Sequence, residues 1–198
     1  MDSLMLNMGM NAIKAKFQEK RLDIDWQDYN YPPGLKIIHY KPQELEDGKK
    51  IMVCHLQHIA FLLIPIYYIV NFISCVIDVG YKGRVFSCLY SVLHVCLAIP
   101  VGIAVLSKCF RSLAFISNEL NWYKYGEFFM IAFGVLVFVC KFLCYHGVGY
   151  VFGQMYDDGW FLFTLGLIEL ILVFLMVVLR VFCVCTVIFK FGKELTQE

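Results

Sequence analysis

Charge is scarce in this sequence, and what the sequence lacks excludes several classes of protein. Only 17% of the 198 residues are charged and 60% are hydrophobic, whereas a soluble domain carries roughly 25% charged and about 45–50% apolar residues. The net charge of +1 argues against a nucleic-acid-binding protein, which would carry a basic surface. Glycine motifs that cradle phosphates are absent too. The composition therefore favours a membrane protein.

The amino end also lacks the features of a secretory signal peptide. It reads Met1-Asp2-Ser3-Leu4, without a basic region, and the first long apolar run begins only near Ile51. We expect the first membrane span to act as an uncleaved anchor.

Nine cysteines are present, but they do not form the paired spacing of a zinc site. Most lie within or beside apolar runs, which favours a role in helix packing. Reversible palmitoylation of Cys54 or Cys109 is the alternative. No serine, cysteine or histidine is placed as a nucleophile would be. We therefore expect no enzyme, no cofactor and no metal.

Long apolar runs fill the rest of the chain. A helix needs about 20 mostly apolar residues to cross a bilayer, and four stretches qualify: 51–77, 84–107, 127–151 and 160–189. The runs are continuous and do not alternate, so helices are favoured over a barrel. The predicted fold is an all-α integral membrane protein, a bundle of four transmembrane helices over 51–190. A cytosolic segment, 1–50, precedes it, and a short tail, 191–198, follows it.

The segment 1–50 holds 16 of the 33 charged residues and has two parts. Apolar residues at helical spacing predict an amphipathic helix over about 4–22, with a frayed tail as the alternative. Prolines 32, 33 and 42 exclude a continuous helix over 26–42 and favour an extended strap.

Lysine and arginine counts near the span ends predict the orientation. The flank before the first span, the loop 108–126 and the tail form one side, with eight basic residues: Lys41, Lys49, Lys50, Lys108, Arg111, Lys124, Lys190 and Lys193. The two short loops carry Lys82 and Arg84. Both termini and the central loop are therefore predicted to be cytosolic.

Two charged residues fall deep within predicted spans. Lys141 and Glu169 each lie about 14–15 Å below the outer boundary, at about 1.5 Å per residue. We predict that they form a structural intramembrane ion pair, with an ion pathway or independent snorkelling as alternatives. Arg180 lies three turns beyond Glu169, where it can snorkel or approach Glu127.

The loop 108–126 combines Lys108, Arg111 and Lys124 with aromatic residues. Such a loop can lie in the membrane interface and bind acidic lipid. Ordinary retention of positive charge in the cytosol is the alternative interpretation.

Several motifs, in this order, resemble the secretory carrier membrane proteins, four-span proteins of post-Golgi vesicles. Asn30-Tyr31-Pro32-Pro33 is similar to the family's Asn-Trp/Phe-Pro-Pro, and Lys36-Ile37-Ile38-His39 is similar to the Pro-Ile-Ile-His of plant members. Cys109-Phe110-Arg111 stands where the family has its short basic-aromatic "E peptide". Glu127-Phe128-Phe129 and Asp158-Gly159-Trp160 open the third and fourth spans as in the family.

The resemblance implies a non-enzymatic carrier in exocytosis, endocytosis and recycling at Golgi, endosome, secretory vesicle and plasma membrane. It also implies contact with phosphoinositides and cytosolic trafficking proteins. The amino segment lacks Asn-Pro-Phe repeats, so we expect no recruitment of adaptors through that motif. A subunit of a larger membrane complex is the alternative, and homo- and hetero-oligomers are both open. A small transporter is a third reading, but no interrupted helix is expected from the sequence.

Overall fold

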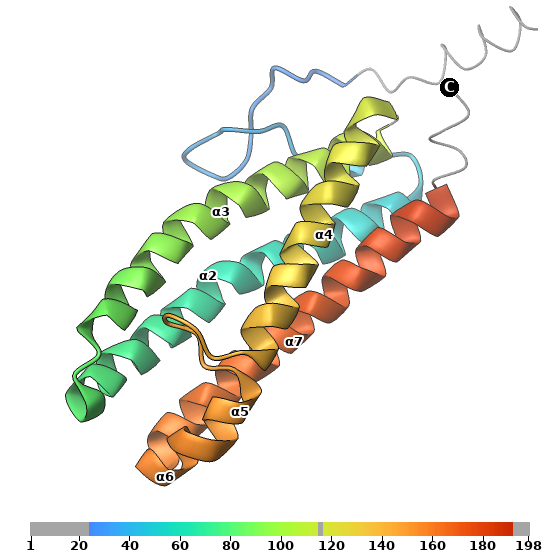
Figure 1. Ribbon diagram of the computed structural model, residues 1–198. Helices are drawn as coiled ribbons and strands as arrows, with labels where there is room; N and C mark the ends of the chain where they lie inside the picture. Colours follow the sequence, from blue (N-terminus) through green and yellow to red (C-terminus); the bar gives the residue numbers. More distant parts are fainter. Residues whose placement is uncertain (1–23, 115–116, 192–198) are drawn as a thin grey trace, which may run out of the picture.

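The computed structural model describes residues 24–114 and 117–191, and it has four long helices (Figure 1). These are α2 (Gly48–Lys82), α3 (Val85–Leu113), α4 (Ser117–Val139) and α7 (Trp160–Thr186). Around the bundle, α2 packs against α3 and α7, and α4 packs against the same two helices. The predicted fold class is confirmed. The amphipathic helix predicted over 4–22 and tail residues 192–198 lie outside the described residues.

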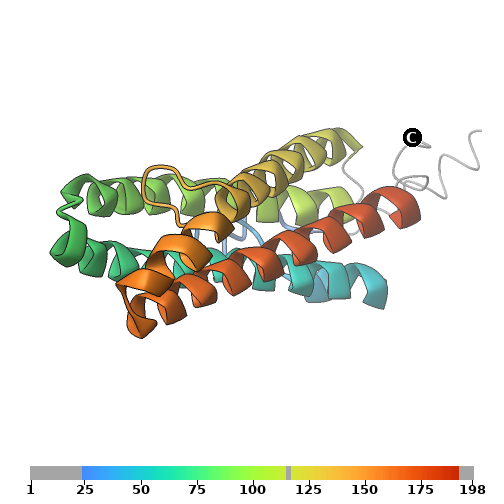
Figure 2. The same cartoon turned by 60° about the horizontal axis from the view of Figure 1, so that its bottom comes forward.

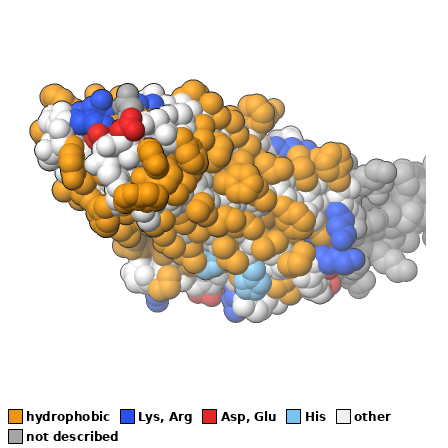
Figure 3. Space-filling view, turned by 90° about the horizontal axis from the view of Figure 1, so that it is seen from below, with side chains coloured by type: hydrophobic (Ala, Val, Ile, Leu, Met, Phe, Trp, Pro, Cys, Tyr) orange, Lys and Arg blue, Asp and Glu red, His pale blue; other side chains and the backbone are white. Residues whose placement is uncertain are grey.

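All four helices are long and apolar enough to cross a membrane. Their outward faces carry large apolar side chains, such as Phe86 and Phe128, which are 73% and 75% exposed. In Figure 3 this surface is largely apolar, and most of the visible charged side chains gather toward its ends and lower edge. A soluble protein does not expose so extensive an apolar surface. The chain is therefore an integral membrane protein.

The first two helices extend beyond the predicted spans because their ends are polar. Asp47 caps α2 by accepting a hydrogen bond from the Lys49 amide at 2.8 Å. Gly83 ends α2 with φ of 68°, a left-handed conformation that glycine adopts without strain. α3 begins at Val85, directly after Arg84. α7 agrees with its predicted span and is followed by a π-helical turn, η3 (Val187–Phe191).

The loop predicted over 108–126 is largely helical. α3 continues to Leu113 and α4 begins at Ser117, so only three residues separate them. Phe110 and Leu113 are fully buried, whereas the Trp122 and Tyr125 side chains on α4 are 67% and 72% exposed. Aromatic residues favour the membrane interface. The charges that suggested a loop instead lie in the last two turns of α3 and the first two or so turns of α4.

The third predicted span, 127–151, is not one continuous helix. α4 ends at Val139, and residues 140–147 turn back into the bundle without helical structure (Figures 1 and 2). Three short helical pieces then lead to α7: α5 (Val148–Tyr150), the π-helical η2 (Val151–Met155) and α6 (Tyr156–Asp158). We call residues 140–147 the interrupted segment.

Buried side chains hold the interrupted segment in place. Cys144, Tyr145 and His146 are at most 5% exposed. The Tyr145 hydroxyl lies 2.8 Å from that of Tyr68, and the Asn71 side chain donates to the Cys144 carbonyl at 2.9 Å. Non-helical backbone at membrane depth requires such partners, because lipid offers none.

Candidate functional site

Residues 24–47 form the strap, which lies across the end of the bundle where α2 begins and α3 ends (Figure 1). We call this the strap end. The Phe110 ring contacts Trp26, His39 and Tyr40, with ring centroids 5.6 to 5.8 Å apart. The Tyr40 hydroxyl donates to the Cys54 carbonyl at 2.7 Å, and burial raises the Tyr40 pKa well above its ordinary value. The strap is thus a packed part of the fold.

His39 joins two parts of the strap from a nearly fully buried position. Its Nδ1 lies 2.7 Å from the Asp28 carbonyl and its Nε2 lies 2.7 Å from Glu44 Oε2. Both partners are acceptors when the Glu44 carboxyl is ionised, so both bonds form fully only with a doubly protonated imidazole. Partial burial raises the Glu44 pKa, but hydrogen bonds from His39 and Lys41 outweigh it and the pKa is lowered.

The lowered pKa of Glu44 predicts how strap stability depends on pH. A carboxyl with a lowered folded pKa stabilises above its unfolded pKa, about 4.3 for glutamate, and this stability is lost as pH falls through the folded value. We expect hydrogen exchange of strap amides, corrected for intrinsic rates, to accelerate below about pH 4.3. Glu44→Gln should remove this step and accelerate exchange at neutral pH. The exposed neighbour provides the control, Glu46→Gln; equal behaviour of the two variants would contradict the prediction.

The three predicted lipid-binding cations lie at the strap end. Lys108 Nζ is 2.5 Å from Glu119 Oε2, and Arg111 Nη1 is 3.6 Å from Glu119 Oε1. The Arg111 guanidinium also lies over the Trp26 ring, 5.4 Å from its centroid. Lys124 is five residues beyond Glu119 on α4. An acidic lipid must therefore compete with Glu119 for two of these cations.

A second charged group lies wholly inside the bundle. Arg180 Nη1 on α7 donates to Glu127 Oε1 on α4 at 2.9 Å, and both side chains are at most 1% exposed. The approach of Arg180 to Glu127 that the sequence suggested is confirmed. The Gln57 side chain also donates to Glu127 Oε1. Five buried atoms in this group have no hydrogen-bond partner within the described structure: Gln57 Oε1, Tyr123 Oη, Glu127 Oε2, Arg180 Nε and Arg180 Nη2.

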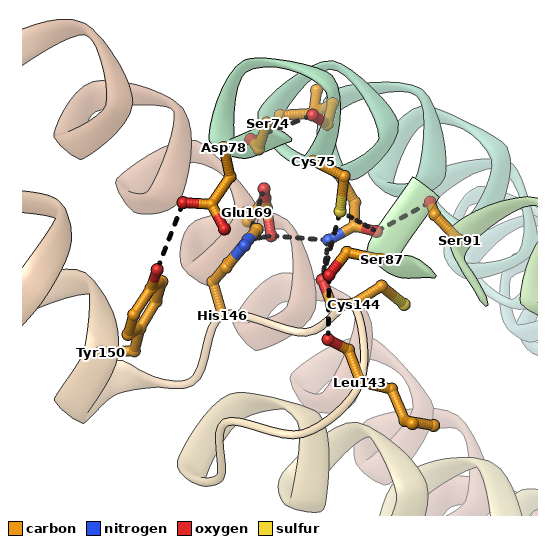
Figure 4. A network of polar contacts seen from close by, with 12 residues as sticks. Ser74, Cys75, Asp78, Ser87, Ser91, Leu143, Cys144, His146, Tyr150 and Glu169 are labelled. Atoms are coloured by element: carbon orange, nitrogen blue, oxygen red, sulfur yellow. Dashed lines mark hydrogen bonds and ion pairs between the residues drawn. The ribbon is translucent and has the colours of Figure 1, made fainter. Parts of the chain in front are cut away.

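The third polar group surrounds Glu169 in the other half of the bundle (Figure 4). His146 Nδ1 lies 3.1 Å from Glu169 Oε2, and the Asn71 side chain donates to the same oxygen at 3.0 Å. The structure thus brings Glu169 together with His146 and Asn71, not with Lys141. Lys141 Nζ instead lies 3.2 Å from the centroid of the Tyr150 ring. The predicted pairing assumed a continuous third helix, and Lys141 belongs to the interrupted segment.

The two cysteines considered for palmitoylation have no accessible thiol. Cys54 and Cys109 are both fully buried, so modification by an acyl donor would require the bundle to open. Over the part of the chain that the structure describes, no group of His, Cys, Asp and Glu side chains is arranged to hold a metal ion. The nearby His58, three residues after His55 on α2, is hydrogen-bonded to the Tyr31 hydroxyl at 2.8 Å.

Asn71 and His146 are not among the site residues predicted from the sequence. The only available signal was their polarity inside apolar runs, and that signal does not reveal a partner. His39 was noted only as part of a motif, because the bonds it makes depend on how the strap folds.

The fold and these polar groups define an all-α integral membrane protein with four candidate spans, a folded strap and two polar clusters in the bundle interior. Comparison of the chain with family models, with curated proteins and with solved structures finds no match.

Proposed function

We propose that the chain is a non-enzymatic carrier protein of post-Golgi membrane traffic, with the strap end in the cytosol. This is the role implied by its resemblance to the secretory carrier membrane proteins. The observation that best supports the proposal is the folded strap. A segment as polar as 24–47 is held against the bundle by Trp26, His39 and Tyr40 on Phe110. It thereby presents a defined surface to cytosolic trafficking proteins.

The same end offers a surface for acidic lipid. Lys108 and Arg111 lie in the last two turns of α3, Lys124 lies about two turns into α4, and the exposed aromatics Trp122 and Tyr125 lie on either side of Lys124 in sequence. Aromatic side chains settle at the headgroup level, and each basic residue near an anionic surface gains about 1 kcal/mol. Because Glu119 holds Lys108 and Arg111, it sets the strength of this surface.

Two opposite changes test the lipid surface. The triple variant Lys108→Gln, Arg111→Gln and Lys124→Gln should weaken capture of acidic liposomes by the protein in neutral nanodiscs. The upper limit is about 3 kcal/mol, or about a hundredfold. Glu119→Gln should strengthen capture, because it frees two cations. Lys190→Gln, which removes an exposed cation at the same end, is the control. Unchanged capture in both test variants would remove this mechanism.

Location and orientation test the carrier role itself. Fluorescence of the tagged chain is expected with Golgi and endosomal markers and not with mitochondria. A glycan-acceptor sequence near Asp158 should be glycosylated and one near Asn118 should not. The reverse pattern would overturn the orientation and the cytosolic surface with it.

The interrupted segment favours a second candidate, a small transporter or channel. Transporters commonly place broken helices and backbone carbonyls at the membrane centre, and the Cys144 carbonyl lies among buried polar groups here. Ion flux in proteoliposomes that disappears in Glu169→Gln would support this candidate over the carrier.

A further inference from the structure

The bond between Glu169 and His146 joins two titratable groups inside the membrane-spanning part. Both carboxylate oxygens lie near the imidazole Nδ1, at 3.3 and 3.1 Å. The side chains are nearly fully buried, at 1% and 5% exposure. The other partner of the carboxylate is the neutral Asn71. With a neutral imidazole, the group therefore carries one negative charge that no cation of the described residues contacts directly.

The interrupted segment is what brings the imidazole to this position. A continuous α4 would carry residue 146 along the helix axis, whereas the turn after Val139 returns the chain into the bundle. Ionisable groups within a bilayer are costly and mark ion or proton sites. An Asn or Gln side chain at position 146 could also donate a hydrogen bond to Glu169. The structural role of this position therefore does not by itself require a titratable side chain.

A run of contacts, one ring stacking followed by hydrogen bonds and an ion pair, connects this pair with the end of the bundle opposite the strap. The His146 ring stacks on Tyr150, with centroids 5.4 Å apart. The Tyr150 hydroxyl donates to Asp78 at 3.4 Å and accepts from Lys82 at 2.8 Å. Lys82 also pairs with Asp158. Lys82 and Asp158 are partly exposed, so the run reaches the surface.

We propose that Glu169 and His146 together form a proton-binding site fed from the bundle end that carries Lys82 and Asp158. One proton, released by a water-borne acid at that end, adds to the carboxylate–imidazole pair. The charge of the pair changes from −1 to 0, and no other bond breaks. The site goes beyond the proposed carrier role. In the orientation proposed above, it would respond to the pH of the lumen.

The charges around the pair do not oppose this assignment. Lys82 and Arg84 are held by acids, with Asp78 within 4 Å of both. The Lys141 ammonium lies on the face of the Tyr150 ring. The Glu169 carboxylate is the charged group that contacts the imidazole, at 3.1 Å. Other titratable groups on the surrounding elements include Tyr67, Tyr68, Cys75 and Asp78 on α2, Cys88, Tyr90 and His94 on α3, Cys140, Cys144 and Tyr145 on the interrupted segment, Tyr150 on α5, and Asp157 and Asp158 on α6.

Nuclear magnetic resonance of the histidine side chains tests the site. The full chain, labelled with ¹⁵N-histidine and held in nanodiscs of neutral lipid, contains five histidines. The variant His146→Gln identifies the His146 signal by its loss. That signal should change as the pH is lowered and the pair takes up its proton. In Glu169→Gln, the midpoint of the signal change should need a proton concentration at least about tenfold higher, because the negative charge beside the imidazole has been removed.

Three further variants separate the site from a structural role. Glu169→Asp keeps the negative charge, and the midpoint of its His146 signal change should lie between those of the wild type and Glu169→Gln. If Glu169→Gln does not fold, Glu169→Asp serves as the test variant in its place. Asp157→Asn removes an exposed acid at the same end and should leave the titration unchanged. Tyr150→Phe keeps the ring and should slow exchange of the His146 ring proton with water severalfold. A His146 signal that does not titrate, or that titrates identically without the Glu169 carboxylate, overturns the proposal. Neither result depends on where the protein resides in a cell.

Discussion

Replacing Arg180 with Met is expected to lower the free energy of unfolding by about 3–5 kcal/mol, the usual cost of removing one partner of a buried ion pair. The guanidinium contacts Glu127 at 2.9 Å, and neither side chain is more than 1% exposed. Met fills much of the volume of Arg but leaves the Glu127 carboxylate with only the Gln57 amide as a described partner. The cost comes from this uncompensated charge and not from lost packing.

A double variant distinguishes these two causes. Arg180→Met combined with Glu127→Gln removes both charges, and replacing a whole buried pair is often close to neutral. We therefore expect the double variant to recover most of the stability lost in the single one. Chemical unfolding in detergent micelles measures the free energy of unfolding of both variants. Lys190→Met, which removes an exposed cation in the turn that follows α7, is the control. Equal losses in the single and double variants would show that shape, and not charge, dominates at this position.

The positions of the helices can be predicted from the sequence where hydropathy alone determines them. The apolar runs locate α2, α3 and α7, and the errors at their ends arise from charged residues that continue the helix, such as Lys49, Lys50 and Lys82. The segment 108–126 was misread for the same reason. Its charges suggested a loop, although Arg111 is the last basic residue of α3 and Glu119 lies in the first turn of α4.

The interrupted segment was not predictable from local pattern. Within residues 140–147 only Lys141, His146 and Gly147 depart from an apolar or aromatic run, and burial inside a bundle favours apolar side chains in any backbone conformation. Its stability depends on groups distant in sequence, including Tyr68 and Asn71. The approach of Arg180 to Glu127 was anticipated because it needs only two regular helices. The partner of Glu169 was missed because His146 reaches it from a turn.

Charge placement divides the interior into two halves with different character. Toward the strap end, Glu127 is matched by a cation, Arg180, in direct contact. In the other half, Glu169 bonds a histidine and an amide among the residues that the structure describes. A guanidinium keeps its charge over the whole physiological range, whereas an imidazole can change its charge there. The first group is suited to fixing helix register, and the second to responding to protons.

The second large effect is expected at Gly147, the residue at which the interrupted segment ends. A Cβ atom built there would lie 2.5 Å from the Cys140 carbonyl carbon and 2.7 Å from the carbonyl oxygens of Val139 and Cys140. These are backbone atoms, which cannot rotate away as a side chain would. We expect Gly147→Ala to cost about 1–3 kcal/mol or more and to displace the segment.

Alkylation of Cys144, followed by peptide mass mapping, measures that displacement directly. Cys144 is 1% exposed, so it should react only when the segment opens, and the expected free-energy cost corresponds to at least about fivefold faster labelling in Gly147→Ala. Cys54, buried near the strap end, should react as slowly as in the wild type. Gly149→Ala is the matched control, because a Cβ there meets nothing within 4 Å. Equal labelling of Cys144 in the two variants would mean that the close approach at Gly147 does not hold the segment in the bundle. In that case His146 would reach Glu169 by some other constraint, and the contacts of Tyr145 with Tyr68 and of Asn71 with the Cys144 carbonyl would be the next to test.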